Sequence, residues 1–305
     1  MGQLIKMFDY ISRYEVNPFH YPTQFIQLKR ENWRKLNEVW ENQVELIEHH
    51  VDHTEKEKSN IRSWFNFFSK SEKDIENRDV SSEFDKSLPR TETELRQYFL
   101  DEIFNFQIKW ATSTISQVSF TEQSIYKDQS LKFFLQRLPD IYLVMYYPIF
   151  NVQNVPMDGE IILISPIGIN IIALVEEDED ASIIINDERT WEIEKDDKSS
   201  KLISPLIRLK RCEQIINSIL NKYNIDFPVN KTVLSKQNYF IHSASPYNTT
   251  VIGKREFKQW HEQLRNFSSS LKNIQIRAIE ALLKHCQTTS VRRPEWDHDP
   301  HSTTF

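Results

Sequence analysis

The chain has 305 residues, enough for one large domain or two, and 38 basic against 44 acidic residues give a net charge of -6. This balance argues against a protein that coats nucleic acid by bulk electrostatics, although one basic face remains possible. The four glycines, at positions 2, 159, 168 and 253, cannot form a clustered phosphate-binding loop, which excludes P-loop and Rossmann nucleotide cofactors.

The two cysteines, Cys212 and Cys286, lack the repeated spacing of a disulfide framework or a zinc site, and buried free thiols are expected. The first residues contain no apolar signal core, and no run reaches the roughly 18 apolar residues of a membrane helix. These features predict a cytoplasmic protein without a membrane partner.

The first third of the chain is predicted to be a helical region spanning residues 1–114. Apolar residues between 22 and 53 recur at helical spacing, and the lysine-, glutamate- and serine-rich segment 54–90 is typical of a mobile insertion around a few aromatic residues. Thr91 and Glu94 form a capping-box pattern that predicts a helix running toward Trp110.

Strands are predicted to follow a short helix at 130–138. The apolar run 141–150 is typical of a strand covered on both faces, and the runs 160–165 and 168–175 are separated by Pro166 and Gly168, which favours a tight antiparallel pair. Segments 181–186 and 189–194 are predicted to continue this meander.

Ser204 and Pro205 supply an N-cap and a first-turn proline, which predict a helix. Further strands are expected at 231–235 and 239–244. Apolar spacing from Phe257 to Leu282 predicts one long amphipathic helix in a C-terminal region, 246–305, that ends in a frayed tail. The whole pattern predicts an α/β fold with a mixed sheet.

The segment GEIILISPIGINIIAL, followed by Trp191 and by SPLIR at the start of a helix, resembles the nuclease-related (NERD) domain in order and spacing. That family is similar to restriction-endonuclease-like nucleases of the PD-(D/E)xK type. The resemblance covers about residues 115–245. It implies a restriction-endonuclease-like core with added N-terminal and C-terminal helices.

The resemblance also assigns roles to residues. In the family, a helix supplies a Glu, a strand opening an Asp, the next strand Glu-x-Lys, and a later helix a Gln. The Asp corresponds to Glu160, with Asp158 two residues away, and the Glu-x-Lys pair to Ala173 and Val175. The Gln corresponds to Arg208. The first acid corresponds to Glu122.

Such carboxylates would hold Mg²⁺, which polarises the scissile phosphate and lowers the pKa of its bound water, while the Lys stabilises charge. With the Glu-x-Lys pair replaced, the resemblance implies an inactive pseudo-nuclease that needs no metal or other cofactor and acts as a nucleic-acid-binding or protein-interaction module. The alternative is a divergent Mg²⁺-dependent nuclease whose candidate acids are Glu122, Asp158, Glu160 and Glu177. A third hypothesis is an adaptor that binds only protein.

Two groups of cations are candidates for binding the phosphates of DNA or RNA. Arg208, Lys210 and Arg211 lie on the helix that faces the active cleft in the family. Arg255 and Lys258 lie near the start of the last predicted helix. An ordinary solvated helix surface is the alternative for both groups.

Overall fold

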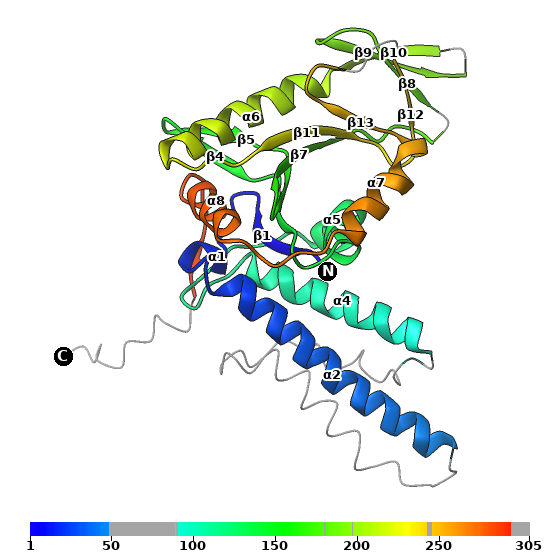
Figure 1. Cartoon of the computed structure of the whole chain (residues 1–305), viewed down its shortest axis with the longest axis vertical. Helices are drawn as coiled ribbons and strands as arrows, with labels where there is room; N and C mark the ends of the chain where they lie inside the picture. Colours follow the sequence, from blue (N-terminus) through cyan, green and yellow to red (C-terminus); the bar gives the residue numbers. More distant parts are fainter. Residues whose placement is uncertain (49–88, 90, 180, 197, 243–245, 294–305) are drawn as a thin grey trace, which may run out of the picture.

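A six-stranded mixed sheet is the centre of the molecule, which we describe from a computed structural model (Figure 1). The described residues are 1–48, 89, 91–179, 181–196, 198–242 and 246–293, so nearly all of the predicted insertion 54–90 and the tail from 294 lie outside them. The strand order is β1 (Gln3–Met7), β3 (Leu143–Tyr146), β6 (Ile161–Ser165), β7 (Gly168–Leu174), β11 (Val229–Leu234) and β13 (Thr250–Ile252).

Strands β3, β6 and β7 form an antiparallel unit, whereas β11 and β13 continue the sheet parallel to β7. The predicted pairing of β6 with β7 is confirmed. Pro166 and Ile167 occupy the turn, in which the Ser165 hydroxyl donates to the Gly168 carbonyl at 2.9 Å. A Cβ at Gly168 would lie 2.8 Å from the Pro228 carbonyl oxygen, so only glycine fits this approach of β7 to the chain entering β11.

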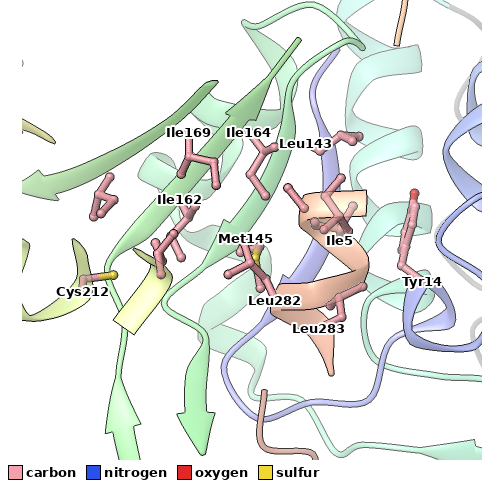
Figure 2. Packing of buried hydrophobic residues seen from close by; sticks show 14 of the residues in the cluster. Ile5, Tyr14, Leu143, Met145, Ile162, Ile164, Ile169, Cys212, Leu282 and Leu283 are labelled. Atoms are coloured by element: carbon pink, nitrogen blue, oxygen red, sulfur yellow. The ribbon is translucent and has the colours of Figure 1, made fainter. Parts of the chain in front are cut away.

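Helices cover both faces of the sheet. On one face lie α6 (Pro205–Lys222) and α8 (Asn273–Leu283), and on the other α5 (Gln129–Gln136) and α7 (Lys254–Asn266). Figure 2 shows the first face, where Leu282 and Leu283 of α8 lie near Met145, and Cys212 of α6 lies near Ile162. Burial of both faces explains why these strands are almost continuously apolar.

Two long helices extend from the body, α2 (Tyr21–Glu48) and α4 (Glu92–Trp110), with the short α1 (Arg13–Val16) before them (Figure 1). Thr91 caps α4 as predicted, because its hydroxyl accepts a hydrogen bond from the Glu94 N–H at 3.3 Å. The two helices pack through aromatic rings, such as Trp33 against Phe99. None of the helices in the described part is long and apolar enough to cross a membrane.

The first region is not purely helical, because β1 pairs with β3 in the central sheet. All five residues of β1 are buried. The boundaries expected near residues 115 and 245 are therefore not boundaries of this sheet, which takes β1 from before the first and β13 from beyond the second.

The apolar run 141–150 is two strands, β3 and β4 (Ile149–Val152), which correct the single predicted strand. Tyr147 between them has a φ of 45°, and the following Pro148 cannot donate to a ladder. Strand β4 forms a separate hairpin with β5 (Val155–Asp158).

The predicted single meander is also wrong, since β8 (Ser182–Ile185) and β9 (Thr190–Lys195) belong to a second sheet of order β10-β9-β8-β12. Its other strands are β10 (Lys198–Ile203), which the sequence analysis did not predict, and β12 (Tyr239–His242). Trp191 of β9 is fully buried in the main core cluster and so joins this sheet to it, and its ring also contacts Phe240 of β12.

The long C-terminal helix is in fact two helices, α7 and α8, separated at residues 267–272. Phe267 leaves the helical conformation and its ring packs on Tyr142. Three serines follow it, and serine hydroxyls compete with helical hydrogen bonds. The remaining elements are the 3₁₀ helix η1 (Gln123–Lys127) and the strand pair β2 (Gln117–Val118) with β14 (Val291–Arg292).

Candidate functional site

The candidate site lies where β6 begins and β7 ends. Ile161 pairs with Ile172 in the antiparallel ladder, so Glu160, one residue earlier, lies beside Ala173, one residue later. Alternation along a strand places Ile162, Ala173 and Val175 on the face that α6 covers, and all three belong to that core cluster. The acid and the two hydrocarbons therefore share one face of the sheet.

The carboxylate of Glu160 is buried, with 4% of its side chain exposed. Its Oε1 lies 3.4 Å from the guanidinium Nη1 of Arg208 on α6, while Oε2 has no hydrogen-bond partner among the described residues. Burial raises the pKa of Glu160 above its ordinary value, and Arg208 and Arg211 offset this effect only in part. The carboxylate thus faces a guanidinium from the helix above it.

Ala173 and Val175 are packed in the core, with exposed fractions of 0% and 6%. Leu209 and Cys212 of α6 belong to the same cluster and cover this face. The Cys212 thiol is a close neighbour of Glu160, and burial raises the pKa of this thiol to about 12. The positions that neighbour Glu160 on this face of the sheet are therefore apolar, apart from the Cys212 thiol.

The other candidate acids lie in different surroundings. Asp158 is exposed at the end of β5, and its backbone carbonyl accepts a hydrogen bond from Arg211 at 3.4 Å. Glu122 is exposed before η1, where it accepts a hydrogen bond from the Ser124 hydroxyl at 3.1 Å and lies near Tyr10. Within the described part of the chain, no three or more acidic, histidine or cysteine side chains form a group able to hold a metal ion.

Glu177 lies just after β7, in the connection to the second sheet. Its N–H donates to the Oδ1 of Asn238 at 2.8 Å. The amide of Asn238, a fully buried residue, donates in turn to the carbonyls of Asp178 and Ala181, at 2.7 and 3.1 Å. Sequence reasoning missed Asn238, since a single asparagine after an apolar run carries no signal beyond that of a turn.

The cations of α6 lie along the first two turns of the helix. Ser204 caps it as predicted, accepting a hydrogen bond from the Leu206 N–H at 3.3 Å, and Leu209 points into the core. Arg208, Lys210 and Arg211 are exposed. Arg208 therefore both pairs with buried Glu160 and reaches solvent, with 44% of its side chain exposed.

A further set of polar groups at this end of the sheet was also missed. The Tyr146 hydroxyl donates to the Oδ2 of Asp128 at 2.6 Å, and burial together with Glu160 raises the pKa of Tyr147 to about 12. The Lys236 ammonium lies 4.6 Å from the centre of the Phe133 ring, and burial lowers its pKa. These residues come from separate segments, and no spacing in the sequence links them.

Comparison with known proteins gives a short match. A stretch of 41 residues, 13% of this chain, is 51% identical to an RNA 2',3'-cyclic phosphodiesterase of Geobacillus stearothermophilus and spans 13% of that protein. No family model matches the chain. No solved structure matches it either.

Proposed function

We propose that this chain is a NERD-like pseudo-nuclease, a restriction-endonuclease-like core that has lost hydrolysis and binds nucleic acid through the cations of α6. The observation that carries the proposal is the pairing of buried Glu160 with Arg208 beside Ala173 and Val175. The short phosphodiesterase match covers too little of either protein to carry an activity across.

The order of elements supports the core assignment. The resemblance requires a strand that opens on an acid, a next strand that bears two catalytic positions on one face, and a later helix that faces the same cleft. In this chain Glu160 directly precedes β6, Ala173 of β7 and Val175 just after it lie on one face, and α6 covers that face. The helix position of the family Gln holds Arg208, which meets the acid directly.

Three physical features argue against hydrolysis. Mg²⁺ demands near-octahedral oxygen ligands and gives up water reluctantly, so one buried carboxylate is a poor site. The guanidinium of Arg208 already provides positive charge beside that carboxylate. No ammonium can come from position 175, where the side chain is valine. The carboxylate is therefore explained as the buried partner of a structural ion pair.

The retained role rests on the exposed cations of α6. Neutralising each phosphate releases counterions, so even two or three cations on one helix turn give measurable, salt-dependent binding. Arg211 also contacts the Asp158 carbonyl, which ties the helix to the β4–β5 hairpin and fixes the position of the guanidinium. The net charge of -6 confines this attraction to the local surface.

The test joins a cleavage assay to a binding assay. Plasmid and oligonucleotide substrates with Mg²⁺ or Mn²⁺ are expected to remain intact. Fluorescence anisotropy with a labelled duplex in EDTA is expected to show binding that Lys210→Gln/Arg211→Gln weakens, reducing the salt slope by about 1.8. The matched control, Arg30→Gln/Arg34→Gln on exposed positions of α2, removes the same charge and should leave binding unchanged.

One observation favours the second candidate, a divergent Mg²⁺-dependent nuclease. The buried Oε2 of Glu160 lacks a protein partner and could accept a cation as a ligand. Metal-dependent cleavage that Glu160→Ala abolishes would establish this candidate and overturn the pseudo-nuclease. Absence of both cleavage and binding, with a protein recovered in pull-down experiments, would instead identify a protein adaptor.

A further inference from the structure

Helix α7 carries a line of basic residues that the α6 proposal does not use. Lys254, Lys258, His261 and Arg265 follow the spacing i, i+4, i+7 and i+11, which places them along one side of a helix. The apolar side is turned to the core, where Trp260 is 9% exposed. Apart from the half-buried His261, the line is exposed. Glu256 and Glu262 partly offset its charge, and Glu256 is engaged in capping the helix through the Gly253 N–H at 3.1 Å.

An exposed aromatic ring lies at the start of this line. Tyr239, the first residue of β12, is 38% exposed. Its ring centre lies 5.5 Å from the Lys254 ammonium and 5.2 Å from the Arg255 guanidinium. Ile241, on the same face of β12, is 51% exposed. An apolar platform and two cations therefore meet at one place. The platform belongs to β12 of the second sheet, and the cations belong to α7, which packs on the central sheet.

The surface continues along α7 toward α5. The His261 ring stacks near Phe257, with planes 19° apart and centres 6.1 Å apart, and it also contacts Phe133. Phe133 carries the Lys236 ammonium on its own face at 4.6 Å. Rings of α7 and α5 and the Lys236 ammonium thus lie together at this end of the surface.

We propose that the α7 surface, defined by Tyr239, Lys254, Arg255 and Lys258, binds single-stranded nucleic acid. The inference rests on the proposed nucleic-acid-binding function and adds to it a second surface, because α7 and α6 cover opposite faces of the central sheet (Figure 1). Lysine and arginine neutralise successive phosphates, and the tyrosine ring accepts a stacked base when the cations that lie over it turn to those phosphates.

Single strands fit this surface better than duplex, since a base can reach a ring only when it is unstacked. An acidic peptide would use the cations, and the ring would serve only as their partner, with no base to stack on it. An anionic membrane would also be attracted by the same cations, and binding to phosphatidylserine vesicles distinguishes it from nucleic acid below.

The experiment measures anisotropy of fluorescein-labelled single-stranded RNA and DNA 12-mers on the full chain in EDTA across a salt series. Tyr239→Ala is expected to weaken binding at least about fivefold, because stacking is lost, whereas Tyr239→Phe keeps the ring and the affinity. Lys254→Gln/Lys258→Gln is expected to reduce the salt slope by about 1.4. Arg30→Gln/Arg34→Gln on α2 is the control of equal charge, and far-UV circular dichroism verifies that every variant folds.

Each outcome separates this inference from the α6 proposal. If the Lys210→Gln/Arg211→Gln variant loses binding and the α7 variants bind as tightly as the wild type, the α7 surface is overturned and the α6 proposal stands. The reverse result supports α7 and removes α6. An undetectable affinity of the wild-type chain for every oligonucleotide overturns both binding claims. Preferential α7-dependent binding to phosphatidylserine vesicles overturns the α7 surface alone, and the prediction of no cleavage is tested separately.

Discussion

At the scale of single residues, Glu160 and Arg208 define the character of the site. The acid is buried, and its partner reaches from an exposed helix position. Because burial dominates over the arginine charges, the pKa of Glu160 is raised and the ionised form is less favourable in the folded chain than in water. The arginine charges therefore compensate only part of the free-energy cost of burying the ionised carboxylate.

Glu160→Gln is expected to be more stable than the wild type at neutral pH. A raised pKa in the folded state means that the stability present below the unfolded pKa is lost as pH rises through the folded pKa. The advantage of the variant should vanish below the ordinary pKa of about 4.3 for glutamate and reach a plateau above the folded value. Urea unfolding between pH 4 and pH 8 measures the difference.

Arg208→Ala is the complementary change and should act in the opposite direction. It leaves a buried carboxylate without its cation, which costs about 1–2 kcal/mol at pH 7 once the exposure of Arg208 is taken into account. Combining it with Glu160→Gln should recover most of the loss. An Arg208→Ala chain as stable as the wild type at pH 7 would show that the pair does not hold this site.

At the scale of elements, the central and the second sheet are joined by buried Asn238. Its side-chain amide donates hydrogen bonds to two backbone carbonyls of the connection after β7. Its backbone N–H donates to the Ser235 hydroxyl, and its backbone carbonyl accepts from the Lys254 N–H at the start of α7. One side chain thus fixes where the chain leaves one sheet and enters the other. This explains why the predicted single meander divides after β7.

Asn238→Ala should lower the free energy of unfolding by about 2–4 kcal/mol. The change removes the partner of the buried Ala181 carbonyl, the partner of the partly buried Glu177 N–H, and one of the two donors to the Asp178 carbonyl. A buried polar group left without a partner costs about 1–3 kcal/mol. Asn230→Ala, at an exposed position of β11, is the matched control and should stay within about 0.5 kcal/mol of the wild type. Equal midpoints for the two variants in guanidinium unfolding would refute this role.

At the scale of the whole molecule, β1 ties together segments that are distant in sequence. The Leu4 N–H donates to the Gln107 side chain of α4 at 2.7 Å. The fully buried Lys6 ammonium bonds Glu15 at 2.5 Å and the Thr288 hydroxyl at 3.0 Å. The beginning, the middle and the end of the chain therefore meet around one strand.

Glu15→Gln is expected to destabilise the fold by about 2–3 kcal/mol, because it leaves the buried Lys6 ammonium without its counter-charge. Lys6→Met/Glu15→Gln should be more stable than the single variant, since methionine fills the space without a charge. Thermal unfolding followed by circular dichroism compares the two. A double variant that unfolds below the single one would rule out the buried charge as the cause.

Features that depend on neighbouring residues were predictable from the sequence. The Thr91 and Ser204 caps and the β6–β7 turn at Pro166 follow from side-chain chemistry within one helix turn or one hairpin. The mixed α/β class followed from the alternation of such segments. The apolar character of Ala173 and Val175 was likewise visible in the residues themselves.

Other features were decided only by tertiary structure. Contacts between residues far apart in the chain decided the end of β3 before Tyr147 and the placement of β1 in the central sheet. They also decided the partners of Glu160 and Tyr239. Hydrophobic periodicity reports which side of an element is buried, but it does not report what covers that side. The sequence by itself determined the capped helices, the β6–β7 hairpin and the apolar character of the positions beside Glu160. Packing determined that Arg208 pairs with this acid and that α7 meets an exposed tyrosine.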